Sequence, residues 1–102
     1  MATSEQLFDK VTETVWFHLE ARYRHRLDIE QACQRRATAA EIGAMESVMD
    51  TFTAEYRGAL SVLCSAVQIM RPGTRQSVRW FVLDWARRND KEIPEGILRG
   101  EP

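Results

Sequence analysis

Residues that break helices are scarce in the first seventy positions of this chain of 102 residues. The first of its three prolines is Pro72, and only Gly43 and Gly58 of its five glycines come earlier. A stretch with so few breakers is compatible with long helices. The later prolines and glycines predict one internal turn at residues 72–73 and an irregular tail over residues 90–102.

Cysteine and metal-binding patterns are also lacking. Cys33 and Cys64 are too few for a disulfide scaffold and form no C-x-x-C motif, so we expect two free, buried thiols. His18 and His25 are seven residues apart, and the chain has no E-x-x-H motif. We therefore expect no metal site, no cofactor, and two partly buried or interfacial histidines, with a pH-sensitive interface as a lesser alternative.

No catalytic signature is present. The chain has no Walker loop, no dinucleotide-binding glycine pattern and no G-x-S-x-G motif. Catalysis needs a nucleophile, a base and an orienting group in one site, and the sequence offers no such set. We therefore expect that the protein is not an enzyme.

Positive and negative charges nearly balance, because the formal net charge is −1. Bulk charge therefore does not draw the chain toward nucleic acid or membrane surfaces. No apolar run approaches the roughly 18 residues of a membrane-spanning helix. The first ten residues lack the basic start and the apolar run of a signal peptide. We expect one cytoplasmic domain over residues 1–102.

Three helices are predicted from capping and breaking signals. They cover about residues 4–36, 39–70 and 75–89. Thr3 with Gln6 and Thr38 with Glu41 have the spacing of capping boxes. Thr74 is the expected cap of the third helix.

The second predicted helix carries the clearest apolar repeat, with a period of seven. One position holds Ile42, Met49, Tyr56, Leu63 and Met70, a second holds Met45, Phe52, Ala59 and Ala66, and Val48, Val62 and Ile69 widen the stripe on one side. Such a seam indicates a long helix in a bundle or antiparallel coil. Met45, Met49, Phe52, Tyr56 and Leu63 are the expected core or dimer seam. Gly58 in this helix indicates either a close helix crossing or a flexible break.

The distribution of charge favours an antiparallel hairpin of the first two helices. Acidic residues dominate the start of each of these helices, and basic residues dominate the end of the first and the segment after residue 56. Folding back at residues 37–38 sets opposite signs side by side, which selects direction more than it adds stability. A third helix of about 15 residues is only ~23 Å long and cannot cover such a hairpin. We therefore predict an all-α homodimeric helical bundle.

The third predicted helix has two apolar faces. Val78, Phe81, Val82 and Trp85 fall on one side, and Trp80 and Leu83 fall on the other. A helix that packs on one core needs only one apolar stripe. Trp80, Leu83, Arg87, Gln76 and Arg79 are therefore the expected partner-binding residues. This face could serve either self-association or a foreign partner.

Nucleic-acid binding is the alternative function. Several arginines lie along the third predicted helix, and residues 22–26 form a second basic cluster. A recognition helix, however, needs a polar face toward the groove, and Trp80 and Leu83 suit an apolar pocket better.

No sequence motif assigns the chain to a family. In outline it looks like the small dimeric all-helical proteins, such as quorum-sensing anti-activators, with which bacteria and phages sequester regulators. That likeness implies a homodimeric regulator that binds a protein partner and occludes its functional surface. The alternative is a small helical DNA-binding transcriptional regulator.

Overall fold

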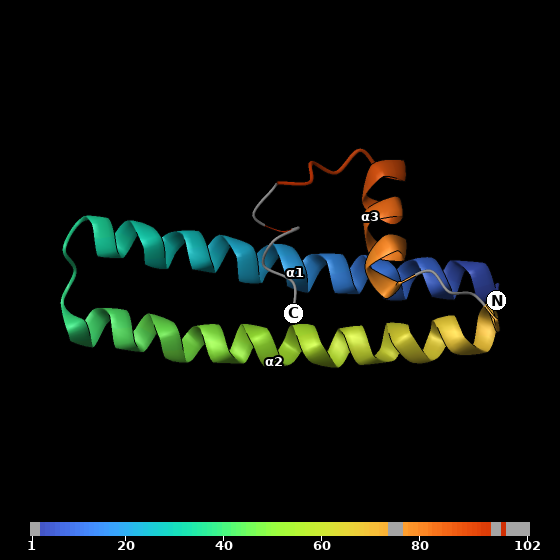
Figure 1. Ribbon diagram of the computed structural model, residues 1–102, viewed down its shortest axis with the longest axis horizontal. Helices are drawn as coiled ribbons and strands as arrows, with labels where there is room; N and C mark the ends of the chain where they lie inside the picture. Colours follow the sequence, from blue (N-terminus) through green and yellow to red (C-terminus); the bar gives the residue numbers. More distant parts are fainter. Residues whose placement is uncertain (1–2, 74–76, 95–96, 98–102) are drawn as a thin grey trace.

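The computed structural model describes residues 3–73, 77–94 and 97, and the regular structure of these residues is helical, which confirms the all-α prediction. The helices are α1 (Ser4–Gln34), α2 (Ala39–Met70) and α3 (Val78–Arg88). The two long helices lie side by side and run in opposite directions, and α3 crosses α1 near one end of the pair (Figure 1). The result is a rod with extents of 49 × 28 × 23 Å.

Two of the three helix starts have the caps expected from the sequence. The Thr3 hydroxyl accepts a hydrogen bond from the Gln6 amide at 3.2 Å, and the Gln6 side chain accepts one from the Thr3 amide at 2.8 Å. The Thr38 hydroxyl likewise accepts from the Glu41 amide at 3.2 Å. Each bond satisfies an amide that the helix itself leaves unpaired.

The third helix is shorter than predicted. Ser77 caps it by accepting a hydrogen bond from the Trp80 amide at 3.3 Å, so α3 begins at Val78 rather than at residue 75. The expected cap Thr74 lies outside the described residues. The first helix also ends two residues early, because Arg36 adopts a left-handed φ of 57° that turns the chain toward α2.

The core lies at the end of the rod where α3 crosses. The fully buried side chains there come from all three helices and from Ile97; they include Phe8, Val15, Trp16, Leu19, Tyr56, Leu63, Val67, Phe81, Val82 and Trp85. The rings of Phe8 and Phe81 meet edge to face with centroids 5.4 Å apart. This geometry adds to the burial of both rings.

The expected seam of α2 divides between the two ends of the rod. Tyr56 and Leu63 are fully buried in the core of the chain itself. Met45, Met49 and Phe52 lie toward the turn, where they are only half-buried. The seam is therefore complete where α3 covers it and incomplete where α1 and α2 pair alone.

Gly58, in the second half of α2, neither breaks the helix nor marks a crossing among the described residues. The helix continues through Gly58 without interruption, which makes the prediction of a flexible break wrong. A Cβ atom added at Gly58 would meet nothing within 4 Å, so neither α1 nor α3 as described approaches it closely. Gly58 is solvent-exposed.

The cysteines are free, as predicted, but they are not both buried. Cys33 is exposed in the last turn of α1, beyond the reach of α3, and Cys64 is half-buried. His18 and His25 are half-buried, in agreement with the prediction. Over the part of the chain that the structure describes, no helix combines the length and the apolar content needed to cross a membrane.

Candidate protein-binding surface

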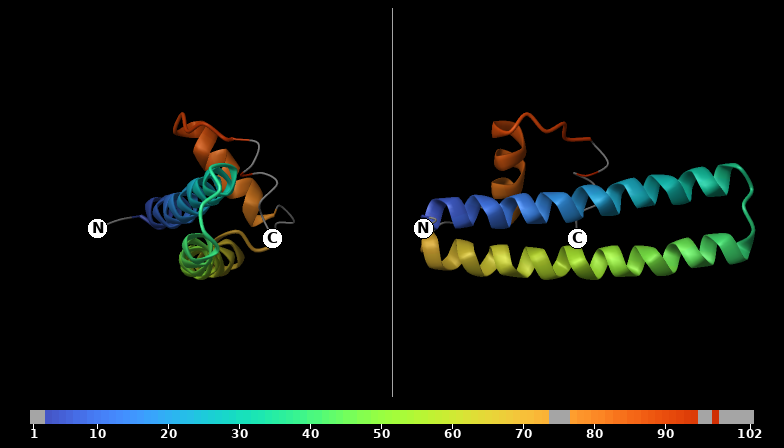
Figure 2. Two further views of the ribbon diagram at one scale, coloured as in Figure 1. Left: turned by 90° about the vertical axis from the view of Figure 1, so that its left-hand side faces the viewer. Right: turned by 180° about the vertical axis from the view of Figure 1, so that it is seen from behind.

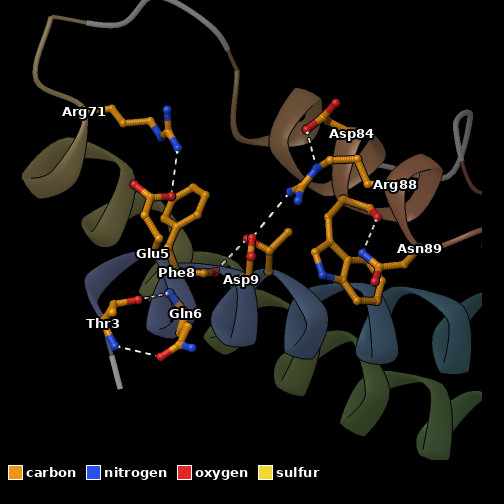
Figure 3. A network of polar contacts seen from close by, with 11 residues as sticks. Thr3, Glu5, Gln6, Phe8, Asp9, Arg71, Asp84, Arg88 and Asn89 are labelled. Carbon is orange, nitrogen blue, oxygen red and sulfur yellow. Dashed lines mark hydrogen bonds and ion pairs between the residues drawn. The ribbon is translucent and has the colours of Figure 1, made fainter. Parts of the chain in front are cut away.

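Arg71 fastens the crossing helix to both long helices. It follows the last residue of α2, and its Nη2 atom lies 3.2 Å from Oε2 of Glu5 on α1. Its guanidinium carbon lies 5.2 Å from the ring centroid of Phe8, and Figure 3 shows Arg71 with Phe8 and Glu5. The same carbon lies 5.6 Å from the ring centroid of Phe81. A guanidinium over two aromatic faces and beside a carboxylate holds α1, α2 and α3 together at one point.

Arg88 makes a second attachment at the other end of α3. Its Nε atom donates to Oδ2 of Asp84 at 3.0 Å, and its Nη2 atom donates to Oδ1 of Asp9 on α1 at 3.4 Å (Figure 3). The hydrogen bond to Asp84 raises the pKa of Arg88, and the bond to Asp9 acts in the same direction. Arg71 and Arg88 therefore link α3 to α1 at two points.

The inner face of α3 is the apolar stripe expected from the sequence. Phe81, Val82 and Trp85 are buried, and Val78 packs against the same core. The backbone carbonyl of Trp85 also accepts a hydrogen bond from the Asn89 side chain at 2.8 Å, which caps the end of the helix.

The outer face of α3 carries most of the expected partner-binding residues. Trp80 is 43% exposed, and its ring lies edge to face on Phe81 with centroids 5.1 Å apart. Arg79 and Arg87 are exposed and Leu83 is half-buried. Gln76, the fifth expected residue, lies outside the described residues. We call Trp80, Leu83, Arg79 and Arg87 the Trp80 face.

The basic cluster at residues 22–26 is tied into the hairpin. Nε of Arg22 donates to the Thr53 hydroxyl at 3.2 Å, and its guanidinium lies over the Tyr56 ring. Nε2 of His25 donates to a backbone carbonyl of α2 at 2.7 Å, and Arg24 pairs with Glu20 on its own helix. Charges already engaged in this way must give up those contacts to bind phosphates.

The two long helices also expose large apolar side chains: Leu7 and Phe17 on α1, and Val48, Val62 and Ile69, which share one face of α2. We call these residues the open flank. The end-on view shows α3 over one side of the α1–α2 pair, with no described element over the other (Figure 2). The sequence contained a signal for this surface, because residues 48, 62 and 69 share one heptad position of α2.

The described residues form a shallow hollow but no metal-binding cluster. A shallow hollow of about 330 Å³ lies between α1 and residues 91–94, and the charged side chains along it include both signs, Glu20 with Arg24 and Lys91 with Glu92. Within those described ranges, no three His, Cys, Asp or Glu side chains are grouped to hold a metal ion. Comparison with protein-family models, with curated proteins and with solved structures found no match to this chain.

Proposed function

We propose that this protein is a small cytoplasmic regulator that forms a homodimer, binds another protein and blocks that partner's activity by covering its functional surface. The Trp80 face carries this proposal. A helix held at both ends by Arg71 and Arg88 presents a large aromatic side chain to solvent. Tryptophan and arginine are the residue types that most often dominate binding energy at protein interfaces.

Rigidity strengthens the case for binding through α3. Trp80 rests against the buried ring of Phe81, so its side chain loses little conformational freedom when a partner covers it. Arg79 and Arg87 lie on the same helix and can supply polar contacts at the rim of an interface. The expected partner surface is an apolar pocket with acidic groups around it.

DNA binding by a small transcriptional regulator is the second candidate. The observation in its favour is that α3 follows a short connection and exposes Arg79 and Arg87. Two features weigh against it. The outer face of α3 is centred on Trp80 and Leu83, and Arg71 and Arg88 are occupied in holding the helix.

A capture experiment separates the two candidates. The full-length chain, immobilised through a tag, is incubated with cell extract before and after nuclease treatment, and bound proteins are identified by mass spectrometry. We expect one partner that survives nuclease and is lost with Trp80→Ala, whereas Gln68→Ala, an exposed change on α2, retains it. Binding of a labelled DNA duplex that weakens by orders of magnitude between ~50 and ~200 mM salt would instead support the DNA-binding candidate. Equal capture of the partner by Trp80→Ala would overturn the proposal.

A further inference from the structure

The open flank is poor in charge as well as exposed. Val62 is 56% exposed and Ile69 is 79% exposed, although both lie in the middle or final turns of a long helix. Residues 58–70 of α2 contain no charged side chain. Depletion of charge together with exposed aliphatic groups is typical of the buried centre of a protein interface.

Two apolar residues of the open flank, Val48 and Val62, are placed symmetrically about the middle of the rod. His18 of α1 and Glu55 of α2 meet there, with Nδ1 and Oε2 3.6 Å apart. Val48 and Val62 lie seven residues to either side of Glu55 on the same face of α2. A two-fold axis beside Glu55, perpendicular to the rod, would therefore set Val48 opposite Val62 of a second copy.

In α1, Phe17 and Ala21 are placed symmetrically about the same point along the rod. Phe17 and Ala21 lie two residues to either side of Leu19, the neighbour of His18. Phe17 is 66% exposed, and a shallow hollow of about 300 Å³ lies along Phe17, Glu20, Ala21 and Arg24. The same axis sets the protruding ring of Phe17 opposite Ala21 of a second copy, which pairs a large side chain with a small one.

Charged residues at the edge of the open flank also favour an antiparallel arrangement of the two copies. Lys10 and Asp28 lie nine residues to either side of Leu19, five helical turns apart. Lys10 has a local partner, Glu13, at 3.5 Å, and both side chains are solvent-exposed. In an antiparallel dimer, Lys10 of each copy would also face Asp28 of the other. Pairs of this kind at an interface rim select direction rather than supply affinity.

The side of the rod that carries the open flank is large enough for a stable dimer. The rod is 49 Å long. Two adjacent helices, each about 10 Å across, give this whole side a projected area of roughly 1,000 Å². A specific interface of standard size buries about 800 Å² on each partner.

We infer that a second copy of this chain docks antiparallel on the open flank, with the two-fold axis beside Glu55 and His18. This inference rests on the homodimer of the proposed function. It assigns self-association to the open flank and leaves the Trp80 face for the foreign partner. The exposed glycine at position 58, which neither α1 nor α3 as described approaches, borders the same face of α2.

Light scattering tests the surface. We expect the wild-type chain to have twice its monomer mass of 11.8 kDa. Val62→Glu with Ile69→Glu should convert it to a monomer of unchanged helicity, whereas the neighbouring exposed changes Ser61→Glu with Gln68→Glu should leave it dimeric. A dimer that survives Val62→Glu with Ile69→Glu would overturn the open flank but not the homodimer. A wild-type monomer at high concentration would overturn both.

Disulfide trapping tests the register. The background carries Cys33→Ser and Cys64→Ser. In that background, Glu55→Cys alone should form a covalent dimer on oxidation, and chains with Val48→Cys should cross-link to chains with Val62→Cys in a mixture. Strong self-cross-linking of Val48→Cys would indicate a parallel arrangement and would overturn the proposed axis. Cross-linking of Gln68→Cys at the same rate would show that the trapping reports random collisions, and this outcome would also count against the inferred interface.

Discussion

The two ends of the rod are built from the same two helices but differ in how they are packed. Where α3 crosses, the core contains aromatic side chains from α1 and α3 in direct contact. At the turn end, Ala32 is the fully buried hydrophobic side chain, and Met45, Met49 and Phe52 remain half-buried. Two helices enclose too little apolar surface to exclude water from their seam, and a third element completes the burial.

This difference separates two sources of stability. The end crossed by α3 has its own core, whereas the turn end depends on local helix propensity and on whatever covers it. In our proposal a second copy of the chain covers the open flank along both halves of the rod. Perturbations of buried core residues should therefore act at any protein concentration, and those of open-flank residues should act in a concentration-dependent way.

The largest expected effect is at the inner face of α3. Trp85→Ala removes a buried indole and should lower the free energy of unfolding by about 3–5 kcal/mol. Trp80→Ala, on the outer face, should cost less, about 1–2 kcal/mol, because 43% of Trp80 is already exposed to water. Urea unfolding monitored by circular dichroism measures both values. If the two variants are equally unstable, α3 does not have separate inner and outer functions.

The next effect compares the two ends along one helix. Leu63→Ala in the core should cost about 3 kcal/mol, whereas Met49→Ala toward the turn should cost roughly 1–2 kcal/mol. Unfolding is measured at two protein concentrations at least tenfold apart. We expect both costs to stay nearly constant with concentration, because neither side chain belongs to the open flank. A cost of Met49→Ala that grows with concentration would mean that the dimer contact lies at the turn end instead.

A smaller effect is expected at the attachment of α3. Arg71→Ala removes the contacts with the rings of Phe8 and Phe81 and the pair with Glu5, and should cost about 1–2 kcal/mol. Arg57→Ala, another exposed arginine on α2, is the matched control and should change stability by less than about 0.5 kcal/mol. Hydrogen exchange of the α3 amides should accelerate in the first variant and not in the second. Unchanged exchange would show that Arg71 does not hold α3.

The smallest effect is at Gly58, near the boundary between the two ends. Gly58→Ala should stabilise the isolated chain by about 0.5–1 kcal/mol, since alanine favours the helix and the added Cβ meets open space. The test is the midpoint of urea unfolding in the Val62→Glu, Ile69→Glu background, where the chain is expected to be monomeric. A loss of stability there would mean that Gly58 has a structural role within the single chain.

The sequence predicted the helices well where side-chain chemistry is local. Thr3 and Thr38 cap α1 and α2 as expected, because a hydroxyl at the first position acts within its own turn. The start of α3 was predicted three residues early, because Ser77 as well as Thr74 can act as a cap and sequence alone does not choose between them. The inner stripe of α3 followed directly from helical spacing.

Burial and pairing between distant residues were harder to predict. The contact of Arg71 with the rings of Phe8 and Phe81 brings Phe8 to residues more than sixty positions away, and no periodic pattern encodes it. Cys33 is exposed because α3 covers only the other end of the α1–α2 pair, and this arrangement cannot be read from local sequence. The open flank was visible as a widening of the α2 stripe, but only the position of α3 shows which side remains uncovered.

The position of α3 near one end of the rod has a consequence for valency. In an antiparallel dimer, the two copies of the Trp80 face would lie toward opposite ends of the assembly rather than side by side. A partner with two equivalent sites could bind both faces at once only if those sites span that separation. A dimeric partner of matching length would then be held with much higher avidity than its monomer, and length itself would become a source of specificity.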